Sequence, residues 1–127
     1  MNTELFKKID DQIRAHPESH DQCSWENRCG TTRCVAGWAV FLTTGSEVYN
    51  TEGGMSAEAR SLAAELGVPV WVEDIARALL DLDRGQATDL FHSTDNEQAA
   101  EIVSAAGRGV TVRALQLLDD AADLDCE

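Results

Sequence analysis

The residues best suited to chemistry lie between Trp25 and Ala39, in a segment that reads WENRCGTTRCVAGWA. Within it, the sequence places Cys34 at the start of a predicted helix and next to Arg33. The positive end of a helix dipole and a neighbouring cation both lower the pKa of a thiol. This placement would suit a nucleophilic or redox-active cysteine, which in an enzyme also needs a histidine base. The chain offers three histidines, His16, His20 and His92.

The same region holds side chains of the types that bind zinc. They are His16, His20, Cys23, Cys29 and Cys34. Structural zinc sites usually combine two closely spaced pairs of ligands, and here only His16 and His20 form such a pair. Cys29 and Cys34 could bracket a metal or form a disulfide that closes a short loop, although a reducing compartment disfavours disulfides. A zinc-binding or redox-thiol module centred on Cys29 and Cys34 is therefore the alternative function.

A purely structural interpretation accounts for every residue of the segment except Cys29. In this interpretation Cys34 is a small buried residue of a central helix. Gly37 lets a neighbouring helix or indole approach that helix closely, and Thr31 and Thr32 are its candidate N-caps. Large aromatic side chains dominate small cores, and the segment contributes two of them, Trp25 and Trp38.

Hydrophobic periodicity predicts an all-α domain with about seven helices. They are expected at approximately residues 4–15, 34–43, 56–66, 71–82, 83–91, 94–106 and 112–124. The second is apolar on every side, which is typical of a helix in the middle of a domain. The others are expected to pack around it as one compact domain over residues 1–127. Gly53 and Gly54 interrupt the helical pattern and indicate a hairpin or short strand near residues 46–55.

Local signals mark the ends of several of these helices. Two pairs of residues have the spacing of a capping box, namely Asp83 with Gln86 and Thr94 with Glu97. Glycine follows three of the segments at the place where a left-handed residue commonly ends a helix. These glycines are Gly45, Gly67 and Gly107.

The chain is strongly acidic, with 23 Asp and Glu against 10 Lys and Arg among 127 residues and a formal net charge of −13. Residues 1–34 carry five bases and six acids, so most of the excess lies in residues 35–127. Because the chain lacks a basic patch, direct binding to nucleic acid is not expected. Acids on the outer helix faces could serve solubility alone or dock on a basic patch of another protein. The candidate binding residues, on the last predicted helix, are Asp119, Asp120 and Asp123.

No segment of the chain has the pattern of a signal peptide or a membrane span. The first fifteen residues mix apolar and charged side chains. The longest apolar candidate, residues 34–42, is about half the length that a bilayer requires. We therefore expect a cytoplasmic protein that keeps its cysteines reduced and does not contact a membrane.

The segment around Cys29 and Cys34 resembles a known sequence signature. It reads W…CGTxxCxAGWA and comprises Trp25, Cys29, Gly30, Thr31, Thr32, Cys34, Gly37 and Trp38. The signature is similar to that of uncharacterised small proteins of actinobacteria and their phages, especially mycobacteriophages, and residues 78–91 are similar to a second block of that group. The resemblance implies a phage-encoded or phage-derived protein that works in a bacterial cytoplasm, and it carries no agreed activity.

The expected function is that of a non-enzymatic interaction protein without a cofactor. It would bind and modulate a host bacterial protein through an acidic helical surface. This expectation depends on the uneven charge distribution and on the phage-like signature. Since carboxylates on helices can imitate the spacing of DNA phosphates, a DNA-mimic inhibitor of a nucleic-acid-binding protein is a lesser alternative. The periodicity indicates no particular oligomeric state.

Overall fold

The computed structural model describes residues 1–27 and 30–110, and this part of the chain is helical. It contains six α-helices and no β-strand, which confirms the predicted all-α class. The helices are α1 (Thr3–Ala15), α2 (Val35–Thr44), α3 (Ala57–Leu66), α4 (Val72–Leu80), α5 (Arg84–His92) and α6 (Asn96–Gly107), with a 3₁₀ turn, η1 (Pro17–Ser19), after α1. The predicted seventh helix, residues 112–124, lies outside the described residues. None of the described helices is both long and apolar enough to cross a bilayer.

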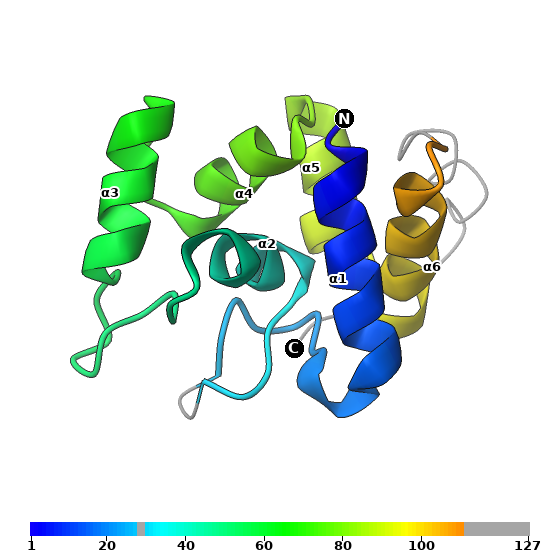
Figure 1. Cartoon of the computed structure of the whole chain (residues 1–127), viewed down its shortest axis with the longest axis horizontal. Helices are drawn as coiled ribbons and strands as arrows, with labels where there is room; N and C mark the ends of the chain where they lie inside the picture. The colour runs from blue at the N-terminus through cyan, green and yellow to red at the C-terminus, as the bar shows by residue number, and fades with distance from the viewer. Residues whose placement is uncertain (28–29, 111–127) are drawn as a thin grey trace.

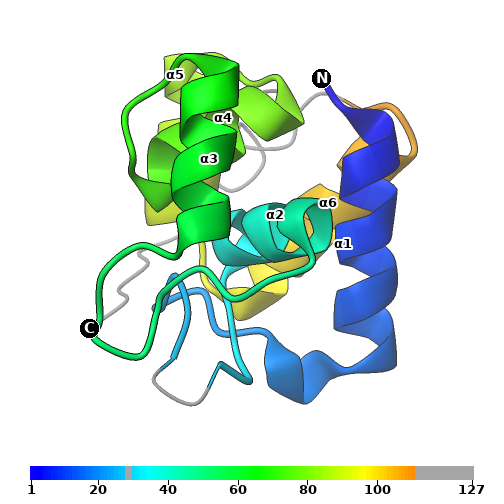
Figure 2. The same ribbon diagram turned by 60° about the vertical axis from the view of Figure 1, so that its left-hand side comes forward.

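The helices form two groups on either side of α2 (Figure 1). α1 and α6 lie side by side at one end of the molecule, and α3 packs against α4 at the other. α2 packs against α1 on one side and against α4 and α3 on the other (Figure 2). Buried apolar side chains from all six helices form one connected cluster. The described residues therefore share a single hydrophobic core.

α2 has an apolar sequence, and its two halves differ in exposure. The first six residues, Val35 to Val40, are buried. Phe41 and Leu42 are partly buried and Thr43 is exposed, so the last turn of the helix reaches the surface. The first half of α2 is thus the part that the core encloses, and the motif segment 25–34 leads directly into it.

Several predicted helix ends are confirmed. Asp83 caps α5 and forms a capping box with Gln86, in which each side chain bonds to the other residue's backbone N–H. Gly45 and Gly67 end α2 and α3 with φ of 74° and 71°. These left-handed conformations favour glycine because it has no Cβ to clash with the backbone.

Two predicted caps are wrong. The capping box of α6 is formed by Asp95 and Gln98, one residue later than expected. The Thr94 hydroxyl instead donates to the Leu90 carbonyl, at the end of α5, where the side chain is buried. Gly107 belongs to α6 itself, and the helix is capped by the next residue.

The start of α2 also differs from the prediction. Its N-cap is Cys34, and neither Thr31 nor Thr32 caps it. The first backbone N–H of the helix, on Val35, is bonded by the side chain of Gln22, which lies thirteen residues earlier. The preceding segment folds back over the helix start, so a distant amide replaces the local hydroxyl that a capping rule anticipates.

The loop after α2 forms the predicted hairpin-like turn without a strand. Tyr49 and Met55 make a single antiparallel bridge. Inside it, the Asn50 backbone N–H donates to the Gly54 carbonyl at 2.7 Å, and the Asn50 side chain accepts from the N–H groups of Glu52 and Gly54. The turn is therefore held by its own asparagine.

Among the described glycines, Gly37 has the least room for a side chain. A Cβ added at this position would lie 1.8 Å from the backbone carbonyl oxygen of Trp25 and 3.0 Å from the Cβ of Arg33. The sequence predicts a close approach here, and the approaching group is the backbone of the motif segment rather than a helix or an indole. The segment can cover the first turns of α2 only because residue 37 has no side chain.

We predict that Gly37→Ala lowers the free energy of unfolding by about 3 kcal/mol or more, because the new methyl group forces the Trp25 backbone away from α2. Urea unfolding measures the change. Gly107→Ala is the matched control, since a Cβ there meets the flexible Lys7 side chain at 3.3 Å and backbone atoms of Lys7 no closer than 3.4 Å. Equal stability of the two variants would contradict the predicted clash.

Candidate functional site

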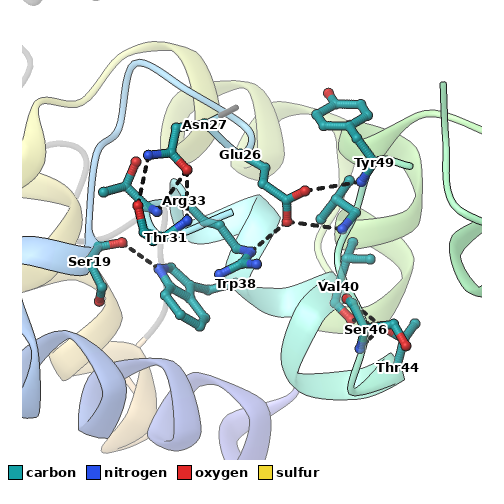
Figure 3. A network of polar contacts seen from close by, with 12 residues as sticks. Ser19, Glu26, Asn27, Thr31, Arg33, Trp38, Val40, Thr44, Ser46 and Tyr49 are labelled. Carbon is teal, nitrogen blue, oxygen red and sulfur yellow. Dashed lines mark hydrogen bonds and ion pairs between the residues drawn. The ribbon is translucent and has the colours of Figure 1, made fainter. Parts of the chain in front are cut away.

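The motif segment is centred on a buried ion pair between Glu26 and Arg33 (Figure 3). Nε of Arg33 donates to Oε1 of Glu26 at 2.7 Å. The two side chains are only 2% (Arg33) and 3% (Glu26) exposed. Removing charges from water is costly, so a buried pair of this kind persists only when its remaining polar atoms are also bonded.

The Glu26 carboxylate is bonded on both oxygens to the loop after α2. Oε1 accepts from the backbone N–H of Val48 at 2.9 Å, and Oε2 accepts from that of Tyr49 at 3.1 Å. The phenol ring of Tyr49 projects away from the carboxylate (Figure 3). One carboxylate thus ties the motif segment to a loop more than twenty residues further along the chain.

The Arg33 guanidinium is enclosed by aromatic rings of α2. Its Cζ lies 4.0 Å from the centre of the Phe41 ring and 4.7 Å from that of Trp38. Cations are attracted to the faces of aromatic rings. Arg33, which is next to Cys34 in the sequence, therefore joins Glu26 to the aromatic side chains of α2.

The backbone of the motif segment runs beside the residues that follow α1. The Arg33 N–H donates to the Ser19 carbonyl at 3.0 Å, and the indole Nε1 of Trp38 donates to the same oxygen at 2.9 Å. Trp38 is only 5% exposed, in agreement with its expected place in the core. Asn27 organises the turn that precedes Arg33, because its side chain bonds to both Thr31 and Thr32.

Gln22 connects this region to the second half of the chain. Its side-chain oxygen accepts from the Val35 N–H at 3.1 Å, and its side-chain nitrogen donates to the Leu90 carbonyl of α5 at 3.0 Å. Its backbone N–H donates to the side chain of Asn96, in the first turn of α6. Nothing in the sequence around Gln22 predicts this role, because no local signal distinguishes it from a surface glutamine.

The structure agrees with the structural interpretation of Cys34 and not with a reactive thiol. Burial raises the pKa of its thiol to about 11, and the backbone N–H groups of Gly37 and Ala36 only partly oppose this rise. The side chain of Arg33, which was expected to lower that pKa, is directed to Glu26. The Cys34 thiol is therefore neutral at physiological pH, which disfavours a nucleophilic role.

Four of the five candidate zinc ligands lie in the described part of the chain, and these four do not form a metal site. His16 is exposed beside Glu18, and Cys23 is exposed. His20 is buried and bonded to Gln22, and burial lowers the pKa of its ring. Cys29 lies outside the described residues. Within those residues, no group of three or more histidine, cysteine or acidic side chains is arranged to hold a metal ion.

A shallow cavity of about 260 Å³ lies next to Cys34, between the motif segment and the end of α5. Its lining includes Cys23, Trp25, Cys34 and His92. The Trp25 ring meets the His92 ring edge to face at 5.7 Å, and His92 bonds to the Glu73 carboxylate of α4. The cavity thus places an imidazole near two thiols, and burial raises the pKa of the Cys34 thiol among them.

A second cavity, the aromatic pocket, occupies about 370 Å³ between the motif segment, the 49–55 turn and the start of α4. It is lined by Trp25, Tyr49, Gly53, Gly54, Met55, Trp71, Val72, Glu73 and Asp74. The predicted fourth helix, over residues 71–82, begins at Trp71. In the structure Trp71 instead precedes the helix as the N-cap of α4, and it is 66% exposed.

Trp71 belongs to a short run of exposed apolar residues where α3 connects to α4. Leu66, at the end of α3, is 36% exposed, and Val70 is 38% exposed. We call Leu66, Val70 and Trp71 the α3–α4 patch. Trp71 and Ile75 have the spacing of one helix face. Because α4 starts at Val72, however, Trp71 lies just before the helix, and its side chain is exposed.

The predicted acidic binding residues, Asp119, Asp120 and Asp123, lie outside the described residues. Elsewhere many acids of the described helices are exposed, as the predicted separation of apolar and charged faces requires. Exposed examples are Glu58 and Glu65 on α3 and Glu97 and Glu101 on α6.

We predict that Glu26→Gln lowers the free energy of unfolding by about 3–5 kcal/mol, because it leaves the buried Arg33 charge without a counter-charge. Urea unfolding measures the effect. The matched control is Glu4→Gln, which breaks an exposed pair with Lys7 (Nζ to Oε1 3.9 Å) and should change the stability by less than about 0.5 kcal/mol. A Glu26→Gln variant as stable as the control would show that the buried pair contributes little.

We predict that Cys34 reacts with a disulfide reagent at least about 100-fold more slowly than an unperturbed thiol, since its raised pKa removes most of the reactive thiolate. The measurement needs a variant that keeps Cys34 and carries Cys23→Ser, Cys29→Ser and Cys126→Ser. The control variant keeps exposed Cys23 instead and should react without denaturant. Rapid reaction of Cys34 in the folded protein would restore the redox-thiol interpretation.

The motif residues that the structure describes meet around the first half of α2. Gly30 turns the chain with φ of 70°, Gly37 admits the Trp25 backbone, and Trp38 fixes the helix to the residues after α1. One of the cavities beside this segment is the aromatic pocket, whose wall includes Trp25. Comparison of the chain with protein-family models, with curated proteins and with solved structures finds no match.

Proposed function

We propose that this chain is a non-enzymatic, phage-type interaction protein. It binds and modulates a host bacterial protein through its acidic helical surface. The net charge of −13 supports a partner with a basic surface, since opposite charges steer association and select partners. The resemblance of the motif to phage proteins supports a partner from the bacterial host.

The observation that carries the proposal is the exposure of the α3–α4 patch. Trp71 is 66% exposed, whereas the other tryptophans, Trp25 and Trp38, are partly or fully buried. Contiguous exposed apolar residues with a polar rim commonly mark an interaction site, and tryptophan often dominates the binding free energy of such sites. The rim here is acidic, because Glu65 precedes the patch and Glu73 and Asp74 follow it.

The interior of the motif supports a non-enzymatic role. Its charged pair, Glu26 and Arg33, is fully engaged in bonds within the protein. The one buried thiol of the described residues, Cys34, has a raised pKa. Groups that are held neutral or paired in this way stabilise the fold and position the loops at the surface.

We predict that the chain captures a host protein from a mycobacterial lysate and that Trp71→Ala reduces the capture at least about tenfold, as for a central aromatic contact. Quantitative mass spectrometry of the bound proteins measures the ratio. Added salt should weaken the capture, because it screens the attraction between the acidic rim and a basic partner.

The matched control is Val110→Ala, which shortens another exposed apolar side chain, beyond the end of α6. It should leave the capture unchanged. A partner that is retained equally by the Trp71→Ala and Val110→Ala variants would show that the α3–α4 patch is not the binding surface, and the absence of any specific partner would contradict the proposed function.

A further inference from the structure

We propose that the aromatic pocket holds an arginine side chain of the partner protein. This inference rests on the proposed function and specifies the chemistry of its contact. Pocket and patch share Trp71, so a partner that covers the patch also contacts a residue that lines the pocket. The pocket volume of about 370 Å³ is near the lower end of the range for ligand sites, which suits one side chain.

The groups that line the pocket are those that attract a cation. Trp25, Tyr49 and Trp71 supply aromatic rings, and Glu73 and Asp74 supply carboxylates. Guanidinium groups stack on aromatic faces and bond to carboxylates in the same plane, which makes arginine the best match. No lysine or arginine is among the residues that line the pocket.

The core of the protein already contains a guanidinium that is held by aromatic rings and a carboxylate. The Arg33 guanidinium lies over the Phe41 and Trp38 rings and is paired with the Glu26 carboxylate. There the cation comes from the same chain. In the aromatic pocket the rings and carboxylates are present, and the cation has to come from another molecule.

The charges around the pocket favour a cation over an anion. Glu73 and Asp74 occupy the first turn of α4, where they offset the positive end of that helix. His92 bonds to Glu73 from outside the pocket, and Asp74 makes no ion pair with a base of the described residues. Arg77 lies one turn further along α4 and does not line the pocket.

A neighbouring cavity extends the negatively charged surface around the pocket. It occupies about 490 Å³, shares Tyr49 and Gly53 with the aromatic pocket, and includes Glu47 and Glu52 in its lining. Both of these acids are exposed. They add to the negative potential at the pocket and raise the local concentration of a basic segment.

The test uses the whole chain and a short peptide with one central arginine, observed through the three tryptophan indole N–H signals in a ¹H–¹⁵N NMR spectrum. The peptide is added to about 10 mM, because a single such contact gives a Kd near 1 mM. We expect saturable shifts of the Trp25 and Trp71 signals. The Trp38 signal should stay in place, since its N–H is bonded to Ser19 in the core.

Two comparisons make the result specific. A peptide with citrulline in place of arginine has nearly the same shape without the charge, and it should bind at least about tenfold more weakly. Trp71→Ala should abolish the shift of the Trp25 signal, and Asp74→Asn should weaken binding in a chain that keeps all its aromatic rings. Both positions are at or near the surface, and unchanged urea unfolding confirms that these variants are folded.

Absence of any indole shift, equal binding of the citrulline peptide, or undiminished binding to Trp71→Ala would each overturn the assignment. Peptide binding that fails while the chain still captures a host protein overturns only the pocket chemistry. Capture that fails while the peptide still binds overturns the proposed function and leaves the pocket as a site for cations.

Discussion

The buried ion pair between Glu26 and Arg33 is the interaction on which the rest of this structure depends. It connects three parts of the chain that are distant in sequence, namely the motif segment, the aromatic side of α2 and the loop after α2. A carboxylate and a guanidinium are costly to bury. Here each is surrounded by partners, because two backbone N–H groups complete the bonding of the carboxylate and two rings enclose the guanidinium. The pair therefore fixes one arrangement of the loops around α2.

This arrangement explains why a motif that looks chemical in the sequence is structural in the fold. The segment lies against α2 so closely that residue 37 has no room for a side chain. The same contact buries Cys34 and raises the pKa of its thiol. The Gln22 side chain links the start of α2 to α5, because it bonds to the backbone of both. Tight packing at the start of α2 and a reactive Cys34 thiolate exclude each other, because the packing removes the thiol from water. This chain has the tight packing.

The surface differs from the motif interior, since it leaves aromatic and acidic side chains accessible to other molecules. The α3–α4 patch leaves a tryptophan in solvent, and the adjoining pocket combines aromatic rings with carboxylates. Trp25 contributes to that pocket from the motif segment, and Tyr49 contributes to it from the loop that Glu26 holds. The buried ion pair thus also determines the shape of the surface that we propose as the binding site.

What the sequence alone determined is local. The helical class, the Asp83 capping box and the left-handed glycines at positions 45 and 67 depend on residues a few positions apart, and they were predictable because helix periodicity and caps act over such distances. The tertiary structure decided the partners of Glu26, the role of Gln22, the raised pKa of Cys34 and the exposure of Trp71. Each of these depends on segments brought together from distant parts of the chain, so the desolvation and the bonding partners that control them exist only once the chain has folded.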